Sequence, residues 1–302
     1  MIDRNTVGEI IEAQFPQLRP VEVSYLGEGY DSTAFDVNGE FVFRFPKQSD
    51  VEAQLFIEIA ILPRLAERTP IPVPAFSFRG NPSPEFPRHF VGYPKLPGIA
   101  GLDLDLNPSQ LRELAPILGE FLSFLHSFPI DDAIQCGVPP YAPDALLNEV
   151  REEAASHVHV VRHVGLDALE DQLRTMFETP IETGEISGVT PRLVHRDLAS
   201  EHILVDPDTK QVTGIIDWSE ISISDPAIDF AGMFHWGGLD FTNAVLAHYR
   251  VPVDNGLLER ARLLAAAKCI GDIVFGLKTH RQEYIDSAVR ALGYCAPPLE
   301  RT

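Results

Sequence analysis

The chain of 302 residues is 45% hydrophobic, which is enough to bury a large core within one or two domains. It carries 24 basic and 44 acidic side chains, and its formal net charge of −20 repels nucleic acid and anionic lipid while it attracts cations. No apolar run reaches the about 18 residues that span a membrane, and the acidic N-terminal stretch MIDRNTVGEIIEAQF lacks the apolar centre of a secretory signal.

Short stretches of alternating polar and apolar residues lie between residues 20 and 46, as expected for strands that are buried on one face. Turn-forming residues separate these stretches, and Asn38-Gly39 is a strong signal for a tight hairpin. The region therefore predicts a small antiparallel sheet, with strands over VEVSYL (21–26), STAFDV (32–37) and EFVFRF (40–45).

A helix is predicted next, at about residues 50–66. Ser49 followed by Glu52 suits a capping box at its start, and Pro63 is expected to kink or end its last turn. An apolar stripe runs along this helix and is formed by Leu55, Ile59 and Leu62. Residues 69–98 are rich in proline and glycine, and two further strands of the same sheet are predicted within them, over AFSF (75–78) and HFVGY (89–93).

Helical periodicity dominates from Asn107, which is placed to cap a helix with Pro108 at its first position. A second helix is predicted at about residues 143–178. Two short strands then interrupt the helices, over HILV (202–205) and VTGIID (212–217), and the turn DPDTK joins them as a hairpin. The clearest later helices cover ERARLLAAAKCIGDIVFGL (259–277) and QEYIDSAVRAL (282–292).

These elements predict an α+β, two-lobed fold, in which a β-rich lobe of residues 1–95 is joined by a short Pro/Gly-bearing segment to a mostly helical lobe of residues 96–302. Ligands favour the cleft between two such lobes. The three cysteines are widely separated and match neither a zinc pattern nor a disulfide framework, so they predict reduced thiols in a cytoplasmic protein; they are Cys136, Cys269 and Cys295.

The stretch LVHRDLASEHILVDPDTKQVTGIIDW carries the chemistry, because Asp197 and Asp217 stand at the outer ends of the predicted hairpin. A hairpin brings its outer ends side by side, and a carboxylate pair held there can bind Mg²⁺ or face an attacking hydroxyl. Isolated aspartates would instead be two acidic turn residues on a solvated edge. The complete pattern of His-Arg-Asp, then His202 five residues after Asp197, then an apolar pair ending on Asp217, favours the functional interpretation.

VHRDLASEHILV together with GIIDW resembles the catalytic and metal-binding loops of the protein-kinase-like superfamily, and more narrowly those of the aminoglycoside phosphotransferase family of small-molecule kinases. The resemblance covers nearly the whole chain, from YLGEGYDSTAF to the C-terminal helices, and implies a protein-kinase-like fold. By resemblance, Asp197 orients and deprotonates the acceptor hydroxyl, and Asp217 holds Mg²⁺ against the phosphates. His202 stands where protein kinases have asparagine, as a second metal ligand, although imidazole is an uncommon ligand of Mg²⁺.

The resemblance also implies a nucleotide site in the first lobe. Arg44 matches the strand lysine that binds phosphate, with Lys47 three positions later, and Glu58 is its partner on the helix. The loop GEGYDSTAF would lie over the phosphates, and Ser32 would stand in for a missing glycine. VGYPKLPG resembles the hinge that binds the purine. Its residues are Tyr93, Pro94, which offers a carbonyl, and Leu96, which offers an N–H; the bulk of Tyr93 predicts a narrowed pocket that favours GTP over ATP.

No activation loop fits between Asp217 and SDPAIDFAG, which favours a small-molecule acceptor over a protein. Asp225 and Asp229 match acids that tie down the following helix. Glu220, Trp236 and Asp240 are candidates to line the acceptor site, with helix residues near Asp272 and Glu283, because acids and aromatic faces bind ammonium groups. For each of these residues, a solvated acid or a packing tryptophan is the alternative interpretation.

The sequence thus predicts an Mg²⁺-dependent kinase that transfers the γ-phosphoryl group of ATP or GTP to a hydroxyl of a small cationic molecule, foremost an aminoglycoside antibiotic. A macrolide or an amino-alcohol metabolite is the alternative acceptor. A non-catalytic nucleotide-binding pseudokinase is the alternative from another class; Arg44 in place of lysine and His202 in place of asparagine favour it, and the intact Asp197 and Asp217 oppose it. The expected protein is cytoplasmic, a monomer or weak dimer, and has neither nucleic-acid nor membrane partners.

Overall fold

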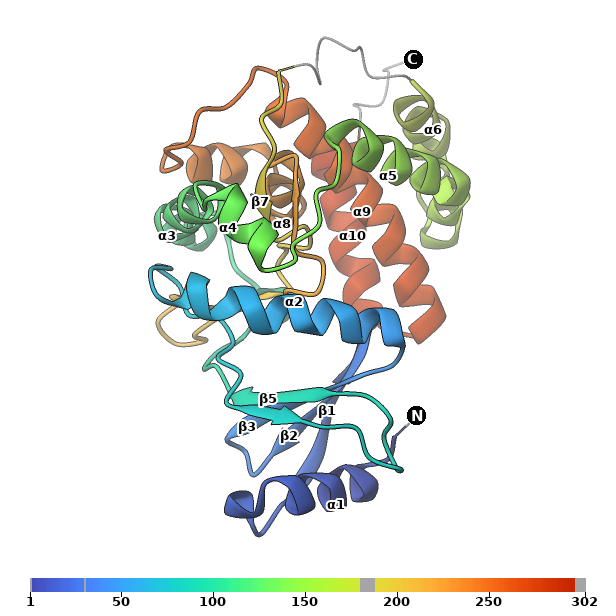
Figure 1. Cartoon of the computed structure of the whole chain (residues 1–302). Helices are drawn as coiled ribbons and strands as arrows, with labels where there is room; N and C mark the ends of the chain where they lie inside the picture. Colours follow the sequence, from blue (N-terminus) through green and yellow to red (C-terminus); the bar gives the residue numbers. More distant parts are fainter. Residues whose placement is uncertain (1, 30, 180–187, 297–302) are drawn as a thin grey trace.

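The chain forms two lobes, a small sheet with two flanking helices and a larger, mostly helical part (Figure 1). The computed structural model describes residues 2–29, 31–179 and 188–296. This arrangement confirms the α+β, two-lobed fold expected from the sequence. None of the described helices is both long and apolar enough to cross a membrane.

The first lobe is an antiparallel sheet in the strand order β1-β2-β3-β5-β4. The hairpins predicted from the sequence are present, and Asn38 and Gly39 both have positive φ between β2 and β3. Phenylalanines fill the core of this lobe, where Phe45 and Phe90 stack with ring centroids 4.4 Å apart. The strands are β1 (Val23–Glu28), β2 (Ser32–Val37), β3 (Phe41–Pro46), β4 (Phe78–Gly80) and β5 (Phe90–Pro94).

Two helices cover the sheet, with α1 on the side away from the helical lobe and α2 between the lobes (Figure 1). The helix α1 (Arg4–Gln14), which was not among the predicted elements, is capped by Asp3. The helix α2 (Ser49–Ala66) carries Pro63 inside its last turn.

Two predictions in this lobe are wrong in detail. Ser49 does not form a capping box, because Gln48 precedes the helix and the Glu52 carboxylate instead accepts a hydrogen bond from the His89 N–H at 2.7 Å. The strand expected at residues 75–78 begins only at Phe78. Prolines at positions 70, 72 and 74 lack the N–H that a ladder needs, so pairing starts beyond them.

The second lobe is built on three long helices that pack together, α8 (Ala227–Leu246), α9 (Leu257–Thr279) and α10 (Gln282–Cys295). The helix α3 (Pro108–His126) packs on α8, and its Asn107 cap forms a capping box with Gln110. Smaller helices complete the lobe and comprise η2 (Gly101–Asp103), α4 (Ile130–Gln135), α5 (Pro143–His157), η3 (Val158–Val164), η4 (Asp167–Leu169) and α6 (Glu170–Glu178). The single helix predicted at 143–178 is therefore wrong, since the chain turns at Gly165, whose φ is +77°.

Short strands beneath these helices position the candidate site. The predicted hairpin is present as β8 (Ile203–Val205) and β9 (Val212–Ile215), with Ile203 opposite Ile215, and β6 (Ile99–Ala100) pairs with β8. A second pair joins β7 (Arg192–Val194) to β10 (Ser222–Ser224). These pairs place the loop after β7 and the loop after β9 at one edge of the helical lobe.

The helix α8 lies so close to the loop after β7 that only glycine fits at position 232. A Cβ atom on Gly232 would lie 1.6 Å from the carbonyl oxygen of Leu198. We expect Gly232→Ala to lower the free energy of unfolding by about 1–3 kcal/mol, as overpacking does, and to displace the loop that carries Asp197. Chemical denaturation and phosphoryl-transfer rates would measure the two effects.

Gly271→Ala is the matched control, because Gly271 is also inside a helix but a Cβ there has open space around it. This variant should be neutral or more stable by up to about 1 kcal/mol, since alanine is the better helix former. Equal stability changes in the two variants would contradict the steric argument.

Candidate functional site

The loop between β7 and β8, residues 195–202, is held by backbone hydrogen bonds to a buried carboxylate. Asp229 of α8 accepts from the N–H of His195 at 3.0 Å and from the N–H of Arg196 at 2.8 Å. His126 of α3 contacts the same carboxylate through Nε2 at 3.0 Å. Asp229 is fully buried, so the loop is fixed to the core and Asp197 is presented from a rigid support.

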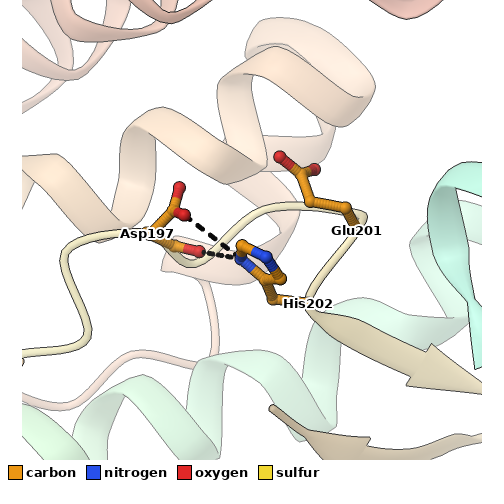
Figure 2. Close-up of side chains that lie close together, drawn as sticks. All are labelled: Asp197, Glu201 and His202. Atoms are coloured by element: carbon orange, nitrogen blue, oxygen red, sulfur yellow. Dashed lines mark hydrogen bonds and ion pairs between the residues drawn. The ribbon is translucent and has the colours of Figure 1, made fainter. Parts of the chain in front are cut away.

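Asp197, Glu201 and His202 lie together at this loop (Figure 2). His202 Nδ1 is 2.7 Å from the Asp197 backbone carbonyl and 3.4 Å from its Oδ2, as the dashed lines show. The Asp197 side chain is 41% exposed, whereas that of His202 is 15% exposed. Asp197 is therefore available to a ligand while His202 is largely enclosed.

Asp217 reaches the same place from the end of β9, as the hairpin predicted. Its Oδ2 lies 3.6 Å from His202 Nε2, and its φ of +61° turns the side chain out of the strand. When His202 donates its Nδ1–H to the Asp197 carbonyl, Nε2 of a neutral ring directs its lone pair at the Asp217 carboxylate. Two electron-rich groups repel each other, so this arrangement is favourable only when a proton or a cation lies between them. Burial opposes protonation of His202, but Asp197, Asp217 and Glu201 outweigh it and raise its pKa.

An arginine links this corner to the first lobe. Arg44 of β3 donates from Nη1 to Glu58 Oε2 at 2.8 Å, and its Nη2 lies 3.5 Å from Asp217 Oδ1. Glu58 is 1% exposed, so it pairs with Arg44 inside the protein and does not lie on the solvated face of α2. Burial disfavours the charged form of Asp217, yet Arg44 and His202 outweigh it and hold its pKa below the ordinary value.

Hydrogen bonds tie Gly29, in the loop that follows β1, to its neighbours in the first lobe. The Gly29 N–H donates to the Ser32 carbonyl at 3.1 Å, and Lys47 Nζ donates to the Gly29 carbonyl at 2.6 Å. Lys47 thus braces the loop, whereas Arg44 is the cation that faces the two acids. Asp31, which was not among the predicted site residues, lies near Asp217, and burial and that neighbouring carboxylate raise its pKa.

The segment that connects the lobes carries the three predicted hinge residues. Tyr93 is buried against Phe76, with ring centroids 5.7 Å apart, and burial raises its pKa to about 12. Pro94 ends β5 and is exposed, and the Leu96 side chain lies over Gly214 of β9. Within the described residues no backbone carbonyl accepts a hydrogen bond from the Leu96 N–H, so this donor is available to a ligand.

The acceptor-side candidates separate into two groups. Glu220 lies at the site, where its Oε2 is 3.2 Å from Arg196 Nη1, and Trp236 packs over Gly101 next to the Ser200 carbonyl. Asp240 is not brought together with them: its side chain is 86% exposed, and its described ion-pair partner is Arg112 of α3, 4.0 Å away.

A lysine that was not among the predicted site residues also lies at this corner. Lys268 of α9 lies with its Nζ 2.7 Å from Glu201 Oε1, 3.2 Å from Asp272 Oδ1 and 3.8 Å from Asp197 Oδ1. Burial opposes the charge on Glu201, but Lys268 outweighs it and lowers the pKa of Glu201. A single lysine within the small apolar run LLAAAKCIG was the available signal.

These contacts decide which side chains suit a metal ion. The atoms of Asp197, Glu201 and His202 lie within 4.8 Å of one another, but Lys268 already neutralises Glu201. Asp217 keeps its charge, its side chain is 43% exposed, and carboxylate oxygen is the ligand that Mg²⁺ prefers. An ionised carboxylate with a neighbouring imidazole therefore fits a hard cation at Asp217, with His202 as the less usual second ligand.

Known proteins are similar to this chain in sequence and fold. Residues 22–264 match the phosphotransferase enzyme family. The uncharacterized protein YcbJ of Bacillus subtilis is 27% identical over 279 residues, which cover 85% of this chain and 84% of YcbJ. Viomycin phosphotransferase of Streptomyces vinaceus is 27% identical over 201 residues, 65% of either chain. The solved GDP and kanamycin complex of APH(2")-IIia is 30% identical, with a TM-score of 0.72 over 94% of this chain and 96% of that chain.

The family match extends from before the β1–β2 loop into α9 and includes both Asp197 and Asp217. The resemblance drawn from the two loop motifs is thereby confirmed, as is the protein-kinase-like fold. The chain belongs to the phosphotransferase enzyme family, and it is a small-molecule kinase of that family.

Proposed function

We propose that this kinase transfers the γ-phosphoryl group of ATP or GTP to a hydroxyl of a small cationic molecule, foremost an aminoglycoside. The observation that carries the proposal is the continuous set of contacts from Asp197 through His202 and Asp217 to Arg44, which spans the junction of the lobes. A hydroxyl acceptor, a metal ion and phosphates need these groups in this order.

In the proposed mechanism Asp197 accepts a hydrogen bond from the acceptor hydroxyl and takes its proton as the phosphoryl group is transferred. Arg44 and the loop with Ser32 bind the phosphates, and Glu58 holds Arg44 in place. Asp217, with His202, would hold Mg²⁺, which when bound neutralises charge on the phosphates. Such positioning and charge stabilisation is most of what phosphoryl transfer requires of a protein.

In this proposal the two lobes have separate roles. Residues 1–95 bind the nucleotide, with the purine at Tyr93, Pro94 and the adjoining Leu96, and residues 96–302 carry catalysis and the acceptor site. Glu220 and Trp236 border the acceptor, whereas Asp240 pairs with Arg112 of α3 and lies apart from them. The kinase acts in the cytoplasm as a monomer or weak dimer, without nucleic-acid or membrane partners.

Relatives support the aminoglycoside as the first acceptor to test. One solved neighbour carries GDP and kanamycin, which is an aminoglycoside, and a second relative, a phosphotransferase for viomycin, supports a cationic antibiotic acceptor more broadly. The acceptor alternatives are a macrolide and an amino-alcohol metabolite. The pseudokinase alternative is opposed by the intact Asp197 and Asp217 and by the Arg44–Glu58 pair.

A coupled nucleotide-turnover screen tests the proposal, with ATP and GTP against aminoglycosides, macrolides and simple amino alcohols in the presence of Mg²⁺. We expect an aminoglycoside to stimulate turnover. Stimulation by an amino alcohol alone would contradict the antibiotic acceptor, and an absence of transfer to every acceptor would contradict the proposed function.

Tyr93 is expected to set the nucleotide preference. Because its buried ring narrows the purine pocket, Tyr93→Ala should raise kcat/KM for ATP relative to GTP by about tenfold, a typical effect of pocket size. Tyr93→Phe, which keeps the ring, should leave the ratio unchanged. Equal use of ATP and GTP that does not change in Tyr93→Ala would refute this role.

A further inference from the structure

A lysine occupies the acidic corner beside Asp197. The helix α9 directs Lys268 toward the 195–202 loop, where its ammonium lies 2.7 Å from Glu201, 3.2 Å from Asp272 and 3.8 Å from Asp197. The Lys268 side chain is 21% exposed, with buried residues before and after it on the helix. Three carboxylates from two elements therefore hold one ammonium in a defined place.

The neighbouring acids of the candidate acceptor site are also paired within the chain. Glu220 lies 3.2 Å from an Arg196 nitrogen, and Arg196 itself stacks over the ring of Tyr141 at 4.5 Å. Glu283 lies 2.7 Å from Arg281. Glu220 and Glu283 are therefore already neutralised when an acceptor arrives, and the ammonium beside Asp197 is that of Lys268.

Position relative to Asp197 distinguishes Lys268 from an ordinary surface ion pair. Its nitrogen is 3.8 Å from Oδ1 of Asp197, whereas His202 contacts the Oδ2 of the same carboxylate. Lys268 and His202 thus contact different carboxylate oxygens of Asp197, the residue that faces the acceptor. An acceptor hydroxyl that reaches Asp197 must come close to the Lys268 ammonium.

We propose that Lys268 is a specificity-determining residue that takes the place of an acceptor ammonium beside Asp197. The acceptor then presents hydroxyl or ether oxygens on the side that faces α9, where the ammonium can donate to them, and directs its own ammonium groups away. A second cation close to Lys268 would meet like charge, and such juxtaposition is a common means of rejecting wrong ligands. The inference rests on the proposed function in that Asp197 is taken to face the acceptor.

Binding of a charged and an uncharged form of one molecule tests the role of Lys268. Kanamycin and fully N-acetylated kanamycin are titrated calorimetrically into the GDP-bound wild type, Lys268→Met and Lys268→Arg. Lys268→Met exposes Glu201 and Asp272 and should bind kanamycin about tenfold or more tightly than the wild type, as expected for a close charge pair. Affinity for the N-acetylated form should change less than about twofold, and Lys268→Arg should resemble the wild type.

Asp272→Asn is a second variant, in which the change in kanamycin affinity should have the opposite sign. It also tests the proposal if Lys268→Met does not fold. Removing one partner leaves the ammonium less compensated, so kanamycin should bind more weakly while the N-acetylated form is unaffected. Equal changes for both forms, or unchanged or weaker kanamycin binding by Lys268→Met, would overturn the proposal and leave a structural role in joining α9 to the loop.

The readouts separate this inference from the proposed function. The calorimetric titration needs no phosphoryl transfer, whereas the proposed function fails only if the wild type transfers phosphate to no acceptor in the screen. Transfer that persists together with equal binding changes for both kanamycin forms would refute the role of Lys268 alone.

Discussion

Asp197→Ala should abolish phosphoryl transfer and leave nucleotide binding intact. The Asp197 carboxylate is half-exposed on a rigid loop, so removing it takes away the group that orients and deprotonates the acceptor. Loss of one such group raises the barrier by about 2–4 kcal/mol, which lowers kcat by roughly 30- to 900-fold. Single-turnover phosphoryl transfer measures the rate, and stabilisation of the protein by GDP during thermal unfolding measures nucleotide binding.

Two further variants make the result specific. Asp197→Asn retains the size of the side chain and its capacity to accept a hydrogen bond, so any rate it recovers over alanine reports orientation without proton transfer. Asp208→Ala removes an exposed acid from the turn of the same hairpin and should behave as wild type. A kcat in Asp197→Ala that stays within about tenfold of wild type would refute the role assigned to this residue.

Arg260→Met should be among the most destabilising single substitutions in the helical lobe. The guanidinium of Arg260 is 2% exposed and contacts Asp225 at 2.6 Å and Asp254 at 2.7 Å. Removing it leaves Asp225, which is equally buried, as an uncompensated charge, and breaking such a buried pair costs about 3–5 kcal/mol. Chemical denaturation measures the change in the free energy of unfolding.

The pH dependence of that loss has a defined sign. Hydrogen bonds from Arg260 lower the pKa of Asp254 in the folded protein. The stabilisation is therefore present above the pKa of an unfolded aspartate, about 3.9, and disappears as the pH falls through the lower folded value. The difference in stability between wild type and Arg260→Met should accordingly shrink in acid.

An exposed arginine supplies the control. Arg250→Met removes a side chain that is 79% exposed and lies 4.0 Å from Glu120, so its effect should stay within about 0.5 kcal/mol. Arg260→Met combined with Asp225→Asn should recover part of the lost stability, because the orphaned charge is then gone. A loss in Arg260→Met no larger than that in Arg250→Met would contradict the argument.

Local patterns predicted much of the fold because the deciding signals were short-range. Alternation and Asn38-Gly39 identified the first strands, and the Asn107 cap identified the start of α3. The helix expected at 143–178 failed because the helical period continues through Gly165, and only the backbone conformation there shows that the chain turns. The Ser49 capping box failed because a residue distant in sequence, His89, binds Glu52 instead.

The site residues that lie on the β8–β9 hairpin could be predicted from the sequence, whereas those contributed by the helices could not. The β8–β9 pairing brings Asp217 to His202, as its two strands required. Lys268 follows Asp197 by more than seventy positions in the sequence. Trp236 and Asp240 are close in sequence, but the kink of α8 at Gly238 lies between them. The packing of α8 and α9 determines what these residues touch, and periodicity in the sequence does not encode it.

The attachment of the 195–202 loop to Asp229 through main-chain N–H groups has a consequence for how such enzymes diversify. Since the anchor accepts from main-chain N–H groups, it is retained when the Arg196 side chain changes, whereas the buried His195 adds a tie of its own, because its Nε2 lies 3.0 Å from the Ile216 carbonyl. The helices that border the acceptor can likewise acquire new residues while the position of Asp197 stays constant. The residues that select the acceptor can therefore change while the position of the catalytic carboxylate is kept.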